Sequence, residues 1–164
     1  MRGQPELYSL FQELEINYEY YEHPPIATIN DAIIHWKDYK SGRCKNIFFR
    51  NHKGDRHYLV ILEHLAKLDI HDLEKRLKQG KLTFASDRRL KEHLCLEPGS
   101  VSPFGLINDR QKNVHLFIDE KLQESDRLAF HPNINTATLV ISKTDFLKFL
   151  DHMGNGYEFI RLYD

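Results

Sequence analysis

Two spacings of apolar residues alternate along this chain, one typical of amphipathic helices and the other typical of strands. Leu7, Leu10 and Leu14 fall at helical spacing and Pro5 suits a first turn, so residues 4–14 are predicted as a helix. Short runs of β-branched and aromatic residues, bounded by turn-forming residues, predict strands. These runs cover residues 18–23, 45–50, 57–62, 82–85, 104–107, 114–118, 127–130, 136–141 and 157–162.

Residues that commonly cap helices mark the start of four further helical segments. The predicted caps and their segments are Thr28 for residues 29–36, Asp69 for a helix ending at Gly80, Ser86 for a helix through Leu94, and Ser142 or Thr144 for a helix through Leu150. Residues 119–124 are predicted as a short helical or turn segment, and residues 154–156 end the last helix.

Turn-forming residues indicate how the strands connect. Residues 51–55 form a predicted turn between two strands, which favours an antiparallel hairpin with a basic tip. A second turn at Asn108-Asp109 predicts that residues 114–118 pair back on residues 104–107. The regular alternation of strand and helix in a doubly wound parallel sheet is missing. The predicted fold class is therefore α/β, with a mixed, mostly antiparallel sheet or partial barrel and flanking helices.

Length and composition favour one globular domain over the 164 residues, with 41% hydrophobic and 12% aromatic residues. No apolar run reaches the roughly 18 residues of a spanning helix, and the first residues lack the layout of a signal peptide. We therefore expect a soluble, cytoplasmic protein with no membrane partner. Two cysteines are too few for a disulfide scaffold, and the ten histidines form no HExxH motif. Neither a metal nor another cofactor is expected.

Charge is distributed unevenly although the net charge is only −1. Residues 1–36 carry a net −5, residues 37–91 a net +8, and residues 92–164 a net −4. A basic middle third can form one positive face for a polyanionic partner that is met locally. A solvated lysine-rich surface accounts for the same counts equally well. DNA is not an expected partner, since a protein that coats DNA would need a basic total.

Three short motifs carry the candidate chemistry. Lys45-Asn46 stands at the mouth of an apolar strand and offers a cation and an amide. The loop Gly99-Ser100-Val101-Ser102-Pro103-Phe104-Gly105 leaves backbone N–H and C=O groups free to face a ligand. His131-Pro132-Asn133 lies between two predicted strands. A cation, an amide and an exposed backbone loop suggest a site for a polar substrate that bears a carbonyl or a phosphate.

The same residues also permit simpler interpretations. Motifs of the GxSxG, Walker and GxGxxG types are absent from the sequence. Catalysis by Ser100 or Ser102 with His131 as base is not favoured, because serines in small loops commonly bond only to backbone. Most lysines are solvated surface residues, and a histidine at a strand end can simply bond backbone. A purely structural role therefore stays open for both Lys45 and His131.

The order and separation of the three motifs resemble one family along almost the whole chain. Lys45-Asn46, Gly99-x-x-x-Pro103 with Phe104-Gly105, and His131-Pro132-Asn133 together resemble the YbaK/ProX family of aminoacyl-tRNA deacylases. That family includes the editing domain inserted in bacterial prolyl-tRNA synthetases. The most similar branch is that of free-standing, PrdX-like alanyl-tRNA(Pro) deacylases. The GxxxP loop alone is a weak motif, whereas the three motifs in this order make a strong joint signal.

The resemblance implies the fold of the YbaK-type, synthetase-associated editing domain. It also implies a metal-independent hydrolase that deacylates mischarged Ala-tRNA(Pro) in trans, by substrate-assisted attack of a positioned water on the aminoacyl ester. In such families the terminal ribose hydroxyl of the tRNA assists the water. The implied partner is an aminoacyl-tRNA, which the protein contacts at the acceptor stem of the proline tRNA. Prolyl-tRNA synthetase is a further candidate partner.

Individual residues take roles from the same resemblance. The implied catalytic residues are Lys45 for charge stabilisation, Asn46 for placing the ester or ribose, Gly99 for its backbone carbonyl, and His131 for lining the pocket or contacting the ribose. The implied substrate-binding residues are Ser100, Ser102, Pro103, Phe48 and Ile33. By charge and not by motif, the candidate tRNA-binding residues are Arg50, Lys53, Arg76, Lys81, Arg88 and Arg89.

Three alternatives to this function remain at the level of sequence. Ile26, Ile29, Ile33 and Phe48 suggest a tight apolar pocket that suits alanine, but serine, cysteine or threonine on the tRNA would be handled by the same chemistry. A non-catalytic tRNA-binding module associated with a synthetase is the alternative from a different class. A metal-dependent hydrolase that uses clustered histidines is a third, less favoured possibility.

Overall fold

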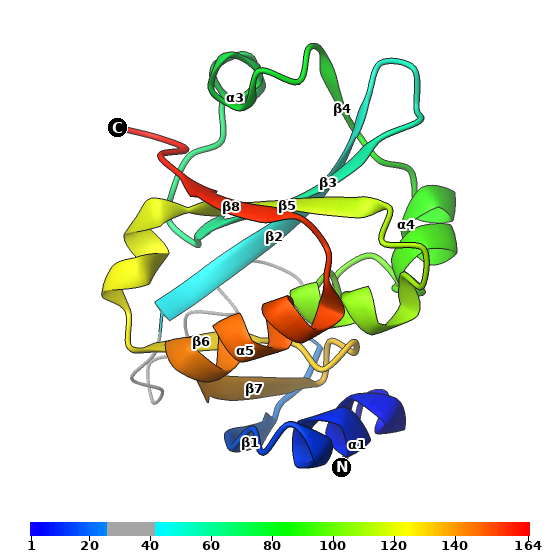
Figure 1. The fold of residues 1–164 in the computed structure, drawn as a ribbon, viewed down its shortest axis with the longest axis vertical. Helices are drawn as coiled ribbons and strands as arrows, with labels where there is room; N and C mark the ends of the chain where they lie inside the picture. The colour runs from blue at the N-terminus through cyan, green and yellow to red at the C-terminus, as the bar shows by residue number, and fades with distance from the viewer. Residues whose placement is uncertain (26–41) are drawn as a thin grey trace.

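The computed structural model describes residues 1–25 and 42–164, and the side chains of Gly42 and Arg43 are not described. Within these ranges the backbone forms a mixed sheet of eight strands with helices around it (Figure 1). The strand order is β1 (Tyr18–Glu22), β7 (Ala137–Ser142), β6 (Arg127–Phe130), β2 (Gly42–Asn51), β3 (His57–Glu63), β5 (Val114–Asp119) and β8 (Tyr157–Ile160), with β4 (Leu82–Phe84) paired to β2. The predicted α/β class with a mixed sheet is confirmed.

Strand β2 joins the two halves of the sheet. Its first residues, Gly42 and Arg43, pair in parallel with β6, and its remainder pairs antiparallel with β3. The predicted hairpin between these two strands is therefore confirmed. The remaining antiparallel pairs are β1 with β7, β6 with β7 and β2 with β4, whereas β3 with β5 and β5 with β8 are parallel.

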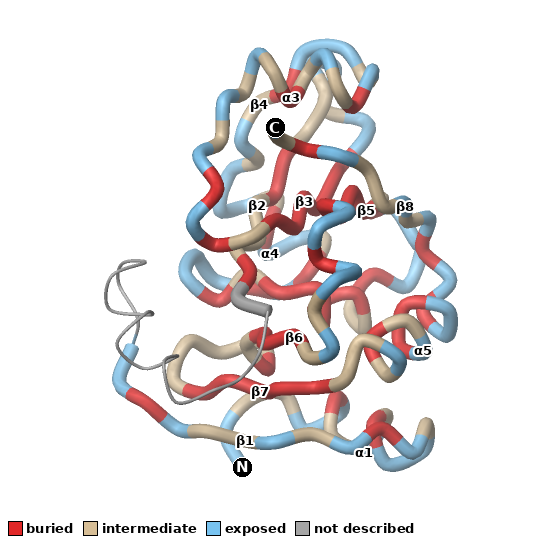
Figure 2. The backbone as a smooth tube through the Cα atoms, turned by 90° about the vertical axis from the view of Figure 1, so that its left-hand side faces the viewer, coloured by how far each residue is buried: buried red, intermediate tan, exposed pale blue. Residues whose placement is uncertain are grey.

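Two apolar clusters lie on the two faces of the β2–β3 part of the sheet. Leu59 and Ile61 of β3 belong to a larger cluster, and Val60 and Leu62 belong to a smaller one. Side chains alternate between faces along a strand, so β3 is buried on both sides (Figure 2). Helices α1 (Pro5–Glu13), α4 (Asp87–Leu94) and α5 (Lys143–Met153) add to the larger cluster, and α3 (Ile70–Leu77) adds to the smaller one.

Three predicted helix caps are present as hydrogen bonds. The Asp69 carboxylate accepts from the amides of His71 and Asp72, and the Ser86 hydroxyl accepts from the amide of Arg89. Of the two candidates before the last helix, Ser142 is the cap. Each bond satisfies a backbone N–H that has no partner inside its helix. Thr28 and the helix predicted over residues 29–36 lie outside the described residues.

One predicted strand is wrong. Residues Pro103–Asn108 form a 3-10 helix, η1, in place of a strand over 104–107. Ser102 caps η1 by accepting from the amide of Phe104 at 3.1 Å, and Pro103 occupies the first turn, where its missing N–H costs nothing. Consequently residues 114–118 do not pair back on this segment, and β5 lies instead between β3 and β8. A second 3-10 helix, η2 (Glu120–Glu124), matches the short segment predicted there.

Candidate active site

Lys45 and Asn46 lie inside β2, on opposite faces of the strand. Because β2 begins at Gly42, the pair is not at the mouth of the strand as the sequence suggested. Lys45 is opposite Leu62 of the smaller cluster, and Asn46 is opposite Ile61 of the larger one. Residues that face each other across an antiparallel pair share a face of the sheet. The two side chains therefore reach different surroundings.

The Lys45 ammonium is half-buried and donates a hydrogen bond to the backbone carbonyl of Ala66, in the loop that follows β3. Burial lowers the pKa of this ammonium, and the nearby Glu63 carboxylate opposes that effect. Within the described residues, neither a hydrogen bond nor an ion pair joins Lys45 to the Gly99 loop or to His131. The structure thus holds this cation beside the end of β3.

Asn46 has a buried side-chain oxygen without a hydrogen-bond partner among the described residues. A buried acceptor of this kind is costly unless a water, ligand or other donor satisfies it. Asn46 shares its face of β2 with Phe48, which belongs to the larger cluster. The free oxygen is therefore available to accept a hydrogen bond from a bound ligand on this face.

The loop before η1 exposes backbone at Gly99 and buries the residues after it. Gly99 is exposed with φ of +86°, a conformation that residues with a Cβ rarely adopt. The amide of Ser100 donates to the carbonyl of Glu97 at 3.0 Å, and Ser102 is fully buried with its hydroxyl engaged as the cap of η1. Pro103 is buried as well. These contacts fix the backbone of the loop, and the Ser102 hydroxyl is used within the loop itself. The substrate-binding role implied for the two serines stays a prediction.

His131 is half-buried and follows the last residue of β6. Its Nδ1 is 2.9 Å from the carbonyl oxygen of Ala137, and its ring centre is 5.9 Å from that of His23. Burial is the main reason why the pKa of His131 is lowered, and the proximity of His23 lowers it further. The imidazole is therefore held in its neutral form near pH 7. His23 itself contacts the Thr138 hydroxyl through Nε2 at 2.8 Å.

The structure brings the Gly99 loop and the His131 loop together. The side-chain amide of Asn133 donates to the Phe104 carbonyl of η1 at 3.3 Å and to Gln4 Oε1 at 2.9 Å. The amide nitrogen of Asn135 lies 3.7 Å from the position that a Cβ on Gly99 would take. Sequence reasoning gave no role to Gln4 or Asn135, and only the presence of Asn133 in a motif pointed to this contact.

Of the predicted apolar pocket residues, the structure describes Phe48 but not Ile33. Phe48 is buried in the larger cluster, where its ring stacks on His57 with 5.6 Å between ring centres. Ile33, together with Ile26 and Ile29, lies outside the described residues.

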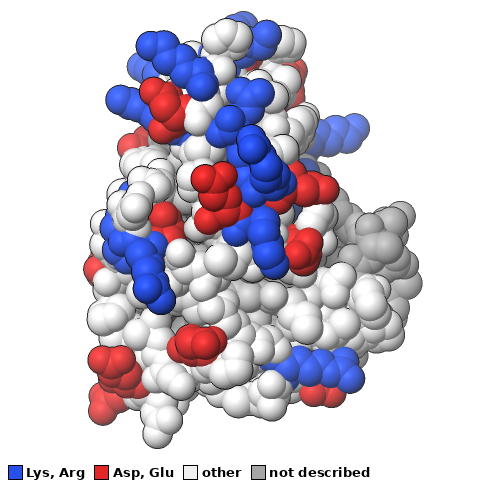
Figure 3. Space-filling view, turned by 90° about the vertical axis from the view of Figure 1, so that its right-hand side faces the viewer, with Lys and Arg blue, Asp and Glu red and all other residues white. Residues whose placement is uncertain are grey.

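The candidate tRNA-binding residues divide into two groups. Three guanidinium groups are engaged: Arg50 donates to the carbonyls of Asn51 and His52, Arg76 pairs with Asp72 and Asp164, and Arg89 contacts the Gly54 carbonyl and His57. Lys53, Lys81 and Arg88 are exposed and form no ion pair within the described part of the chain. Lys and Arg side chains gather over the upper part of the face in Figure 3, toward the end of the molecule that carries α3 and β4.

Across the described residues, no helix is long and apolar enough to cross a membrane.

A solved structure described as a candidate trans-editing enzyme for prolyl-tRNA synthetase shares this fold, with a TM-score of 0.69 and 17% identity over 98% of this chain and 99% of that one. The fold is thus that of an aminoacyl-tRNA editing domain. The family model for the aminoacyl-tRNA editing domain matches residues 23–149, and the chain belongs to this family.

Two curated relatives match along most of their length. The prolyl-tRNA editing protein ProX of Acetoanaerobium sticklandii is 40% identical over 153 residues, covering 92% of each chain. The prolyl-tRNA synthetase associated domain-containing protein 1 of Mus musculus is 31% identical over 154 residues, covering 92% of this chain and 90% of the relative.

Proposed function

We propose that this protein is a trans-editing hydrolase that removes alanine from mischarged Ala-tRNA(Pro). The observation that carries the proposal is the 40% identity, over 92% of both chains, to a prolyl-tRNA editing protein. The membership in the aminoacyl-tRNA editing family supports the same reaction class. The substrate ester joins alanine to the 3′-terminal ribose of the tRNA, and the products are free alanine and uncharged tRNA.

The need for such a reaction follows from the limits of binding specificity. A synthetase pocket built for proline cannot strongly reject a smaller apolar amino acid, because lost apolar contacts discriminate only modestly. A second site that excludes proline by size and hydrolyses alanine corrects the error. An activated ester can be cleaved without a metal when a water is well placed and the developing oxyanion is stabilised.

The described residues supply groups for each part of this task. Gly99 presents exposed backbone whose carbonyl can accept from the α-amino group or from the attacking water, and the unsatisfied oxygen of Asn46 can accept from the ester-bearing ribose. Lys45 supplies the cation that stabilises developing negative charge. Because Lys45 lies on the face of β2 opposite to Asn46, the proposal requires its ammonium to leave the carbonyl of Ala66 and turn toward the substrate.

His131 has a different part in the proposal. Its half-buried and neutral imidazole lines the site and contacts the terminal ribose. The Nδ1 of the ring donates to the Ala137 carbonyl, which fixes the orientation of the imidazole. We assign the assistance of the water to the ribose hydroxyl of the substrate itself and not to His131. We further propose that the protein acts in the cytoplasm on tRNA released by prolyl-tRNA synthetase.

The test is deacylation of Ala-tRNA(Pro) by catalytic amounts of protein, with Pro-tRNA(Pro) and Ala-tRNA(Ala) in parallel. Fast loss of Ala-tRNA(Pro) alone, unchanged by a chelator, is expected. Loss of seryl-, cysteinyl- or threonyl-tRNA instead would contradict the choice of alanine but keep the chemistry. Binding of tRNA without turnover would contradict hydrolysis and favour a non-catalytic binding module. Loss of activity on chelation would contradict the metal-independent mechanism.

A further inference from the structure

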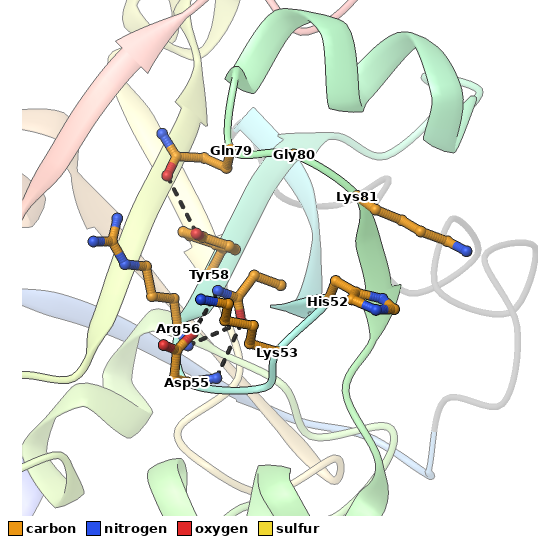
Figure 4. Close-up of a pocket in the computed structure, with 9 residues that line it drawn as sticks. His52, Lys53, Asp55, Arg56, Tyr58, Gln79, Gly80 and Lys81 are labelled. Carbon is orange, nitrogen blue, oxygen red and sulfur yellow. Dashed lines mark hydrogen bonds between the residues drawn. The ribbon is translucent and has the colours of Figure 1, made fainter.

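A hollow on the surface lies between the β2–β3 hairpin tip and the residues that follow α3 (Figure 4). Its volume is about 390 Å³. The lining residues come from both segments: Asn51, His52, Lys53, Asp55, Arg56, Tyr58, Gln79, Gly80 and Lys81. The hollow is separate from the Gly99 loop and from His131, so the proposed reaction makes no use of it.

Three cations and one carboxylate line this hollow. Lys53, Arg56 and Lys81 are all exposed, and none forms an ion pair within the described ranges. Asp55 is the acidic residue among the lining groups, and its carboxylate already accepts from the side-chain amide of Asn51 at 2.6 Å. The hollow therefore carries a net charge of about +2 near neutral pH.

The neighbouring arginines show that this lack of pairing is local. Arg76 binds two carboxylates, those of Asp72 at 2.7 Å and Asp164 at 3.0 Å. Arg89 is engaged by the Gly54 carbonyl at 2.8 Å. These two side chains hold parts of the fold together, whereas the three cations of the hollow have no comparable structural contact with an acid and can meet an external anion.

The backbone beneath the hollow is well fixed. The side-chain oxygen of Asn51 accepts from the amides of Gly54, Asp55 and Arg56 at 2.9 to 3.1 Å, which locks the hairpin tip. On the other wall, Gly80 has φ of +80° and sets the turn that presents Lys81. The Tyr58 hydroxyl donates to Gln79 Oε1 at 3.2 Å and links the two walls. The cations are thus carried on a platform that need not reorganise on binding.

We propose that this hollow binds the phosphate backbone of the RNA substrate through Lys53, Arg56 and Lys81. The inference rests on the proposed function for the identity of the RNA. It extends that proposal, because the surface that binds the nucleic acid is separate from the residues proposed to act on the ester. Phosphate oxygens are the ligands that several unpaired cations on a preformed surface suit best, and such contacts position a nucleic acid without reading its sequence. Arg76 and Arg89 are excluded from this role because their guanidinium groups are already engaged.

The test measures binding of uncharged proline tRNA at 50 to 200 mM salt for the wild type and for a variant carrying K53Q, R56Q and K81Q. The dissociation constant of the triple variant is expected to rise at least about tenfold at the lower salt concentration, and the slope of log K against log salt to fall by about 2 to 3. In deacylation assays KM is expected to rise while kcat at saturating tRNA stays near the wild-type value.

A matched control removes the same charge elsewhere. Arg110, Lys121 and Lys148 are exposed residues outside the hollow, and their joint replacement by Gln changes the net charge equally. This variant is expected to keep most of the affinity. An equal loss in both variants, or no loss in the first, would overturn the proposal. A first variant that keeps its RNA affinity but loses binding to prolyl-tRNA synthetase would overturn it as well and assign the hollow to a protein partner.

The two proposals fail in different ways. A wild-type protein that deacylates no aminoacyl-tRNA contradicts the proposed function, whereas the affinity of the triple variant for uncharged tRNA still decides the role of the hollow. Melting temperatures of both variants are measured first. Lys53, Arg56 and Lys81 are exposed and form no ion pair within the described ranges, so their replacement is expected to cost little stability. In the control, Lys148 pairs with Asp145 at 3.5 Å and donates to the Leu14 carbonyl, so its replacement can cost more.

Discussion

Lys45 and Asn46 are neighbours in sequence but meet different physical constraints. The ammonium of Lys45 has lost part of its hydration and bonds a backbone carbonyl, while the oxygen of Asn46 is buried without a partner in the described part of the chain. A buried polar atom without a partner needs an explanation, and a hydrogen bond to a bound ligand or to a water is one. The two residues therefore call for different experiments.

Lys45→Ala is expected to lower the rate of Ala-tRNA(Pro) hydrolysis at least about 100-fold, because it removes the cation that stabilises the developing charge. Single-turnover deacylation measures the effect, and circular dichroism checks the fold. Lys67→Ala removes an exposed lysine of the loop that contains Ala66 and serves as the control, with a rate near that of the wild type. Normal activity of a folded Lys45→Ala protein would contradict the assignment.

Asn46→Leu is expected to leave the free energy of unfolding unchanged or slightly higher, because no described hydrogen bond to its side-chain oxygen is lost. Deacylation should nevertheless fall. The matched comparison is Asn155→Leu, whose amide donates to Asp109 and to the Val114 carbonyl at 2.9 and 2.8 Å, and which should cost about 1 to 3 kcal/mol. Denaturant melts compare the two, and a large loss of stability in Asn46→Leu would show a structural role instead.

Elements rather than single residues set the position of the Gly99 loop. Helix η1 follows this loop, and Asn133 ties η1 to the segment after β6 and to Gln4. The segment 131–135 thus acts as a brace that connects the two candidate site loops.

Asn133→Gly keeps the left-handed backbone, since φ at this position is +63°, but removes both side-chain bonds. We expect a loss of about 1 to 2 kcal/mol in stability and a fall in kcat larger than the change in KM. Lys112→Gly is the control, because Lys112 is exposed at φ of +57°. An Asn133→Gly protein with wild-type kcat would show that the brace does not position the loop.

A contact between the imidazoles of His57 and His93 links the hairpin to α4. His57 of β3 is buried with its ring centre 3.9 Å from that of His93, and Arg89 lies beside it. Burial, followed by the neighbouring His93 and Arg89, lowers the pKa of His57 to about 4. The unfolded chain, with a pKa near 6.5, therefore binds a proton that the folded state rejects.

The stability that depends on a neutral His57 is fully present above about pH 6.5. It decreases as the pH falls toward 4, because unfolding takes up a proton in that interval. Thermal melts between pH 7.5 and 4.5 measure the slope. His57→Phe is expected to reduce it, since the ring is kept but cannot be protonated. His152→Gln, at an exposed position on α5, should leave the slope unchanged. Identical slopes for wild type and His57→Phe would contradict the assignment.

On the scale of the whole molecule, charge is divided in space as well as in sequence. The basic middle third supplies the hairpin tip, α3, β4 and α4, which lie toward one end of the structure (Figure 1), while β1 at the opposite end carries Glu19 and Glu22. For the proposed tRNA substrate, this division would orient the polyanion before contact.

Affinity for proline tRNA is therefore expected to fall by at least about tenfold between 50 and 200 mM salt. The rate at saturating tRNA should change little, because the residues proposed to act on the ester are not those proposed to contact the backbone phosphates. Filter binding and single-turnover kinetics separate the two quantities. A salt-insensitive affinity would show that the basic end does not hold the RNA.

Much of the fold could be predicted because its causes are local. The caps Asp69, Ser86 and Ser142 act within three residues, and the hairpin depends on a turn between two adjacent apolar runs. The segment 104–107 was missed because its apolar residues have strand character, whereas Ser102-Pro103 starts a 3-10 helix. The family motifs could also be found in the sequence, but the roles of their residues stay predictions.

The sequence by itself determined the helix caps, the central hairpin, the class of fold and the family, since these depend on spacing and on short motifs. Only the tertiary structure decided that β5 lies between β3 and β8, that Lys45 and Asn46 have different surroundings, and which cations remain unpaired. Partners such as Arg76 and Asp164, or Asn133 and Gln4, are far apart in the chain. Their contacts arise from the packing of the whole molecule, which local patterns do not encode.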